Sequence, residues 1–243
     1  METVFRDDSF DKNSLELYQN VISDKKTALQ LAVIREYDLA TESHSRGVGH
    51  VVSEFALSGV TDLDPNELLS FVRLSILHDL GKLSISQLTL NKPSKLSHNE
   101  WKVIEHHSVD GFHRYSAEFD PHEAIPILLH HTLQSNNYPG SLEIERNIAI
   151  YGIDPIELSD DEILTETMIL AMADNIEARY PFINGKQDSK YLRTYSSRRD
   201  YHVEDLPDLV RASFVESGKV RAIGKLVLFD KLIDYSRETF LRK

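Results

Sequence analysis

The sequence predicts an all-α protein, and three observations support that prediction. Four segments open with an N-cap side chain followed three residues later by Glu, which is typical of capped helices. Apolar residues recur at helical spacing through most of the chain. No segment combines an alternating apolar pattern with the turn residues of a β-hairpin. A single all-α domain, folded as a helical bundle, is therefore the simplest interpretation of the 243 residues.

The expected helices follow one another along the chain. Two helices without a capping pattern come first, at about 13–39 and about 44–58. The capped segments begin at Asp64, Ser97, Asp120 and Ser159, and in the first and third Pro occupies the first helical position, where its missing N–H costs nothing. The stretch from about 205 to the C-terminus is also helical in pattern, with Gly218 and Gly224 as interruptions. The segments at roughly 132–158 and 181–203 are rich in Asn, Ser, Gly, Pro and Tyr, and we expect long loops there.

Composition excludes several classes of protein. The formal charge of −12 argues against broad nucleic-acid binding, which needs clustered Lys and Arg. The absence of cysteine excludes disulfides, thiolate nucleophiles and Cys-ligated metals. The N-terminus lacks the apolar core of a signal peptide, and no apolar run approaches the roughly 18 residues of a membrane span, so we expect a cytoplasmic protein. A small phosphorylated substrate stays compatible with this charge, because bound metal ions reverse the local field.

Histidines and aspartates gather within the expected helices or at their ends. The first capped helix ends at His78-Asp79, with Gly81 at the C′ position. The remaining members are His44 near the start of an earlier helix, His106 and His107 on the second capped helix, His130-His131 at the end of the third, and Asp174 in an apolar run of the fourth. Imidazoles and carboxylates suit iron, manganese, zinc or nickel. Two such ions a few ångströms apart form a clamp suited to phosphoester hydrolysis.

Each of these residues also has a purely structural interpretation. A single histidine near a helix end, such as His44, usually acts as a cap or a dipole partner. His130 and His131 could be one core and one surface residue, because helix neighbours point about 100° apart. Asp174 could cap the following turn, although an Asp inside an apolar helix is costly without a partner or metal. Four other histidines are expected on the solvated surface, namely His98, His113, His122 and His202.

The order His44, His78-Asp79, Asp174 resembles the HD superfamily of metal-dependent phosphohydrolases. HDLGK at 78–82, His107 with Gly111 four residues later, the histidine pair at 130–131 and Tyr138-Pro139 resemble its HD-GYP subfamily, whose members hydrolyse the bacterial second messenger cyclic di-GMP. The resemblance covers roughly residues 40–190. It implies an HD-GYP-like domain at 40–243, preceded by an N-terminal helical extension at 1–39.

The resemblance also implies a centre of two divalent ions, iron or manganese, with Asp79 as the bridge. His44, His78, Asp79 and Asp174 would hold one ion, and Asp79, His107, His130 and His131 would hold the other. His107 is chosen over His106 because the family's histidine has Gly four residues later. A hydroxide bridging the two ions would attack phosphorus. Lys82 would contact the scissile phosphate, Tyr138 would contact the nucleotide, and Lys186 would be a second phosphate contact.

The chain departs from the family pattern at several positions. Ala40 replaces the Glu that holds a third metal, so the resemblance implies two ions. The family's HHE-x-x-DG-x-GYP reads HHTLQSNNYP and is one residue shorter, with Thr132 in place of Glu, Ser135 near the Asp position and Asn137 in place of the GYP glycine. The Arg-Pro-Tyr-Arg element that follows the last metal ligand is replaced by FINGK, which ends in Lys186.

These observations favour a metal-dependent phosphodiesterase that linearises cyclic di-GMP or a related cyclic dinucleotide. The altered loop motivates a second hypothesis, a binding module that signals through a protein partner without turnover. A third is hydrolysis of another nucleotide or phosphoester, since fold alone does not decide function. Redox chemistry at a di-iron centre is the remaining alternative. The first ~40 residues are too short for a folded sensory domain, so regulation would come from a partner, a second subunit or the metal.

Overall fold

The computed structural model describes residues 11–61, 63–64, 67–134, 137–179, 206–215, 220 and 224–240. Within these ranges the regular structure is entirely helical, which confirms the predicted all-α class. The elements are α1 (Lys12–Ser23), α2 (Lys25–Tyr37), α3 (Leu39–Leu57), α4 (Leu68–Ile76), the 3₁₀ helix η1 (Leu80–Ser84), α5 (Gln87–Leu90), α6 (His98–Glu105), α7 (His107–Ser116), α8 (Ile125–Leu129), α9 (Ser141–Ala149), the 3₁₀ helix η2 (Pro155–Ser159), α10 (Asp161–Arg179), α12 (Leu206–Val215) and α14 (Leu226–Phe240).

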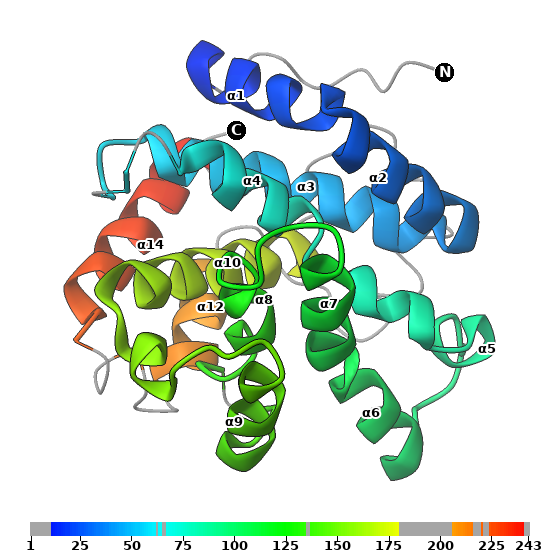
Figure 1. Ribbon diagram of the computed structural model, residues 1–243. Helices are drawn as coiled ribbons and strands as arrows, with labels where there is room; N and C mark the ends of the chain where they lie inside the picture. Colours follow the sequence, from blue (N-terminus) through cyan, green and yellow to red (C-terminus); the bar gives the residue numbers. More distant parts are fainter. Residues whose placement is uncertain are drawn as a thin grey trace.

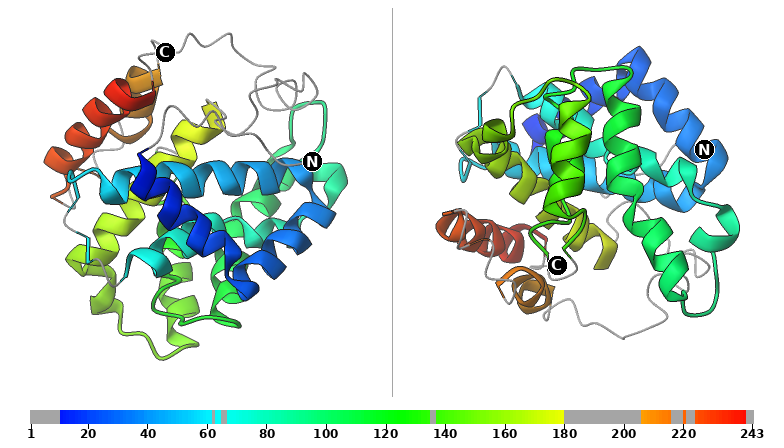
Figure 2. Two further views of the ribbon diagram at one scale, coloured as in Figure 1. Left: turned by 90° about the horizontal axis from the view of Figure 1, so that it is seen from above. Right: turned by 60° about the horizontal axis from the view of Figure 1, so that its bottom comes forward.

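Helix α3 runs through the centre of the bundle. It lies between the α1–α2 pair on one side and α10 on the other, and it also packs against α4 (Figure 1). The left view of Figure 2 shows α1 and α2 lying across α3. Helices α7 and α8 pack side by side and lie below α3 in Figure 1. Helices α12 and α14 pack on each other, and α12 contacts α10. Because neighbours surround α3, thirteen of its nineteen residues are buried, and side chains from α3, α7, α8 and α10 can meet inside the bundle.

The N-terminal helices share the core of the bundle. Tyr18 and Val21 of α1 and Leu31 and Ile34 of α2 belong to the same buried cluster as the apolar residues of α3. The predicted single helix at 13–39 is broken at Asp24, which ends α1 and whose side chain accepts a hydrogen bond from the Thr27 N–H at the start of α2. The boundary that we expect between residues 39 and 40 stays a prediction, although α3 does begin at Leu39.

The four capping predictions have different outcomes. Ser97 and Glu100 form the predicted capping box at the start of α6. The cap of α10 is displaced by one residue, because Asp160 rather than Ser159 accepts from the N–H of Glu162. Helix α4 begins only at Leu68, after an N-cap residue that makes no side-chain cap bond. The intervening Pro65 and Asn66 lie outside the described residues.

The third capped segment was predicted wrongly. Residues 121–124 form turns, and α8 starts at Ile125 with Pro126 in its first turn. The expected capping carboxylate of Glu123 instead accepts hydrogen bonds from the hydroxyls of Ser70 and Tyr115, at 2.9 and 3.1 Å. This tertiary contact replaces the local cap, and α8 is shortened to five residues.

The predicted loop at 132–158 is also wrong in part, because it contains α9 and η2. Apolar Ile144 and Ile148, four residues apart, anchor α9 to the core. Asp154 and Glu157 form a capping box at the start of η2 that the sequence interpretation missed. The predicted C-terminal helices are present as α12 and α14, and Gly224 interrupts them at a positive φ of 73°.

Several predictions fall on residues that the structure does not describe, namely the loop at 181–203 with Lys186, and the residues Ser135, His202 and Gly218. Among the helices that it does describe, none has both the length and the apolar character needed to cross a membrane.

Candidate metal centre

The His78-Asp79 pair lies in the turn that directly follows α4, whereas the sequence predicted that the helix itself would end at this pair. Helix α4 ends at Ile76, and η1 begins at Leu80. The Nδ1–H of His78 donates to the backbone carbonyl of Ser75 at 2.8 Å, three residues earlier. This bond directs the opposite nitrogen, Nε2, into the bundle. Both side chains are almost fully buried.

Gly81 is not the helix C′ residue that the sequence suggested, because it lies inside η1 and its φ is not positive. Its role is close packing against α7. A Cβ atom at this position would lie 1.9 Å from the carbonyl oxygen of His107 and 2.5 Å from the N atom of Gly111. A Cβ at Gly111 would in turn lie 3.0 Å from the carbonyl oxygen of His78. The two glycines therefore let η1 and α7 approach until Asp79 and His107 can meet.

Three buried histidines are oriented in the same way. His78, His107 and His130 each donate from Nδ1 to the carbonyl oxygen three residues earlier, at 2.8, 2.7 and 2.6 Å. A carbonyl can only accept, so Nδ1 carries the proton and Nε2 keeps its lone pair. An imidazole fixed in this tautomer is prepared to bind a metal through Nε2.

His44 of α3 is held by carboxylates. Its Nε2 lies 3.0 Å from Oδ1 of Asp174, and its Nδ1 lies 2.5 Å from Oε2 of Glu177. Both acids are on α10, three residues apart and so on the same helix face. The packing of α3 against α10 thus brings residues that are 130 and 133 positions apart in sequence into contact.

The expected ligands form two groups with Asp79 between them. The ligand atoms of His44, His78 and Asp174 lie within 4.8 Å of one another, and so do those of His107, His130 and His131. Asp79 faces both groups. Its Oδ2 lies 3.5 Å from Nε2 of His78 and 3.7 Å from Nε2 of His44, and its Oδ1 lies 3.4 Å from Nε2 of His107. The structure therefore brings all seven expected ligand residues together.

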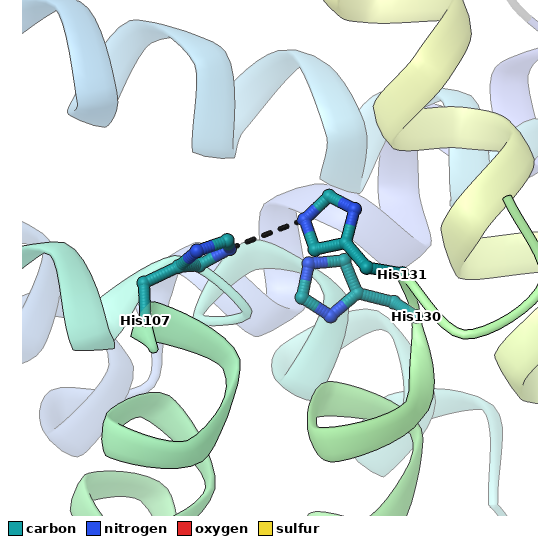
Figure 3. A group of neighbouring side chains, drawn as sticks. All are labelled: His107, His130 and His131. Carbon is teal, nitrogen blue, oxygen red and sulfur yellow. Dashed lines mark hydrogen bonds between the residues drawn. The ribbon is translucent and has the colours of Figure 1, made fainter. Parts of the chain in front are cut away.

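The second group is shown in Figure 3, where the rings of His107, His130 and His131 turn toward one another. The Nε2 atoms of His107 and His131 are 3.2 Å apart. His131 differs from the other rings because packing holds it in place. One face lies against His130, with ring centroids 3.9 Å apart, and Tyr138 stacks at 4.5 Å with an interplanar angle of 31°. Tyr138 thus covers the His107–His131 side of the site.

Burial controls the pKa values of most of these imidazoles. It lowers the pKa of His107 to about 4 and that of His131 to about 3, and it also lowers the pKa values of His78 and His130. These rings are therefore neutral at pH 7, which is the form that binds metals. The pKa of His44 is raised instead, because Glu177 and Asp174 outweigh the effect of burial.

The carboxylates stay ionised despite their burial. Burial alone would raise the pKa of Asp79, but Lys82 and the neighbouring histidines lower it below its usual range. Burial also tends to raise the pKa of Asp174, but the neighbouring His44 outweighs this effect, so the pKa of Asp174 lies well below its usual value. The Nζ of Lys82 lies 2.6 Å from Oδ2 of Asp79 and so places a cation at the edge of the site.

The donor set fits divalent metal ions. Nε2 of His78 and Nε2 of His130 are buried and have no hydrogen-bond partner. Leaving a polar atom in that condition costs about 1–3 kcal/mol, whereas a lone pair that binds a metal is satisfied. Imidazole nitrogens and carboxylate oxygens match the preferences of iron, manganese or zinc.

Other expectations of the sequence have mixed outcomes. His106 is exposed, in agreement with the choice of His107. His98 and His122 are exposed as predicted. His113 is not the solvated surface residue that we expected, because its ring nitrogens bond Asn147 and Tyr151 between α7 and α9. The sequence interpretation missed Glu177, although its spacing of three residues from Asp174 on one helix was a usable signal.

Comparisons with known proteins agree with this geometry. The HD domain family matches residues 41–179. A cyclic di-GMP phosphodiesterase of Thermotoga maritima is 28% identical over 176 residues, which cover 69% of this chain and 43% of that protein, so the chain spans less than half the length of this relative. No solved structure matches the chain. The chain therefore belongs to the HD superfamily of metal-dependent phosphohydrolases and is similar to its HD-GYP branch.

Proposed function

We propose that this chain is a phosphodiesterase that hydrolyses cyclic di-GMP or a related cyclic dinucleotide at a two-metal centre. The observation that carries the proposal is the position of Asp79, whose two carboxylate oxygens face two separate groups of ligands. A carboxylate in this position can bridge two ions. The similarity to a cyclic di-GMP phosphodiesterase supports the choice of substrate.

In this proposal His44, His78 and Asp174 hold one ion, His107, His130 and His131 hold the other, and Asp79 contacts both. When bound, two divalent ions, iron or manganese, supply Lewis acidity toward the phosphate and a water activated for attack on phosphorus. The backbone carbonyls behind His78, His107 and His130 keep these rings in the metal-binding tautomer throughout the reaction.

Lys82 stabilises negative charge in the proposed reaction. Its ammonium group lies beside Asp79 and is largely shielded from solvent, with 13% of the side chain exposed. A cation there can approach the scissile phosphate as charge develops on its oxygens, and its effect is larger in a site that excludes water. We propose that Tyr138 contacts the nucleotide, and its position over His131 supports this role.

The experiment is a turnover assay on protein loaded anaerobically with Fe(II) or with Mn(II). We expect cyclic di-GMP or another cyclic dinucleotide to be converted to the linear product, and Asp79→Ala to abolish both turnover and binding of the two ions. A loaded protein that cleaves no cyclic dinucleotide but does cleave a nucleoside monophosphate or another phosphoester would move the proposal to a different substrate.

A second candidate function is nucleotide binding without turnover. Thr132 stands where the family carries Glu, and its hydroxyl donates to the carbonyl of Leu129 at 2.7 Å, so it brings no carboxylate to the loop beside the site. Tight binding of cyclic di-GMP under both metals, with no product over many hours, would favour this function. Multiple turnovers at a constant rate would exclude it.

A further inference from the structure

Glu177 is a buried carboxylate beside the centre, and it has no role in the family motif described above. It lies on α10 one turn after Asp174, and only 4% of its side chain is exposed. Its Oε2 lies 2.5 Å from Nδ1 of His44. Burying a carboxylate is costly unless it is paired, so this contact compensates for its desolvation.

The packing of α3 against α10 leaves room for this carboxylate. Gly47 lies one turn after His44 on α3, and a Cβ atom there would come within 2.4 Å of Oε1 and 2.5 Å of Cγ of Glu177. Any larger residue at position 47 would push the Glu177 side chain away from His44. The Glu177 side chain from α10 therefore occupies the space that a side chain at position 47 of α3 would need.

This support distinguishes His44 from the other imidazoles. His78, His107 and His130 each donate from Nδ1 to a neutral backbone carbonyl of their own segment. His44 alone among the seven expected ligands has a carboxylate from another helix behind its Nδ1. A carboxylate holds the ring more strongly than a carbonyl and makes Nε2 a better electron donor to a metal.

We infer that Glu177 is a positioning residue for the ion held by His44, His78 and Asp174, and that it sets the affinity of this half of the centre independently of the other half. The inference rests on the proposed two-metal function. It acts through His44, since Glu177 fixes the ring so that Nε2 faces Asp174 and Asp79. The half formed by His107, His130 and His131 has its own supports and does not depend on Glu177.

The test is an anaerobic titration of metal-free protein with Mn(II), followed by calorimetry and by elemental analysis after desalting. Glu177→Gln keeps the size of the side chain and removes its charge. We expect one of the two binding steps to weaken by about 10–100-fold, while the other stays within about threefold of the wild type. Gly47→Ala displaces the carboxylate without removing it and should weaken the same step. Glu166→Gln is a control for the exchange of a buried acid on the same helix, because Glu166 lies outside both ligand groups. Burial raises the pKa of Glu166 to about 8, so this variant changes the side chain without removing a charge at pH 7.

The possible outcomes separate this inference from the proposed function. Two steps of wild-type affinity in Glu177→Gln would overturn the inference and leave the two-metal proposal intact. Equal weakening of both steps would also overturn it, because the effect would then not be confined to one half. A wild-type protein that binds no metal would overturn the proposed function, and with it the inference. A thermal unfolding midpoint of metal-free Glu177→Gln close to that of Glu166→Gln ensures that a lost step reflects the site and not the fold.

Discussion

Replacing Gly81 by alanine tests how the site depends on the close approach of η1 and α7. The added methyl carbon would lie 1.9 Å from the carbonyl oxygen of His107 and 2.5 Å from the backbone N atom of Gly111. Both obstacles are backbone atoms of a helix, so no side-chain rotation relieves the contact. The two segments must separate by about 1.5 Å to restore ordinary van der Waals contact, and overpacking of this kind costs about 1–3 kcal/mol or more.

That displacement acts directly on the centre. Asp79 is two residues before Gly81, and its Oδ1 lies 3.4 Å from Nε2 of His107 on α7. Metal–ligand distances tolerate changes of only about 0.2 Å, so Asp79 can no longer serve both halves. We expect Gly81→Ala to lose the ion held by His107, His130 and His131 and to reduce turnover by about 100-fold or more. We also expect its unfolding midpoint to fall by about 2–4 °C for each kcal/mol lost.

The assay combines elemental analysis, turnover of the proposed cyclic-dinucleotide substrate and thermal unfolding in the presence of a chelator. Gly140→Ala is the matched control, because nothing lies within 4 Å of a Cβ at that position and its φ of −73° suits alanine. The reasoning would be refuted if Gly81→Ala bound two ions and unfolded at the same temperature as Gly140→Ala.

Further predictions concern single groups in the centre. Lys82→Met should still bind two ions in a titration but lose about 10²–10³-fold in turnover, because it removes the cation beside Asp79 and none of the seven expected ligands. Tyr138→Phe keeps the ring that packs on His131 and should retain both ions by elemental analysis, whereas Tyr138→Ala should weaken the ion of that half. Metal-free protein should lose stability in denaturant as the pH falls from about 6.5 toward 4. Over that range His107 and His131 become protonated in the unfolded chain but stay neutral in the folded protein, because their folded pKa values are lowered. Each of the two groups therefore reduces the free energy of unfolding by about 1.4 kcal/mol per pH unit. The stabilisation that follows from the raised pKa of His44 is already complete below about pH 6.5, where this ring is protonated in both states, so it does not offset the loss. Stability that increased on acidification from about pH 6.5 would contradict the prediction.

The helical class was predictable because it depends on local pattern, and the expected ligands were found from the order of the motif along the chain. The capping box at Ser97–Glu100 is complete within four residues and forms as expected. The predicted start of α8 was wrong because the Glu123 carboxylate accepts hydrogen bonds from Ser70 and Tyr115 instead of capping its own helix. Helix propensity describes the preference of an isolated segment, so it does not include a tertiary partner such as Ser70, more than fifty residues away.

The pair His130-His131 shows that helical periodicity does not predict side-chain directions beyond the end of a helix. On an ideal helix, neighbouring side chains diverge by about 100°, which suggested one core and one surface residue. In the structure α8 ends at Leu129, so the pair lies in the turn beyond the helix, and both rings enter the site with centroids 3.9 Å apart. Helical periodicity does not apply at an end, and the order of the motif was the better guide.

The placement of the ligands explains why ends matter so much in this protein. His78 and Asp79 follow α4, His107 begins α7, and His130 and His131 follow α8, so five of the seven expected ligands lie where a helix starts or stops. At the end of a helix the last carbonyls lack intrahelical partners, and those of Ser75 and Ile127 accept from the rings of His78 and His130. Backbone groups that would otherwise need water thus orient the metal-binding rings. His44 lies inside α3, where such carbonyls are already used by the helix, and so its support has to come from a side chain of another helix. Glu177 provides this support from 133 residues away, so it does not belong to a motif that lies within one segment around a histidine.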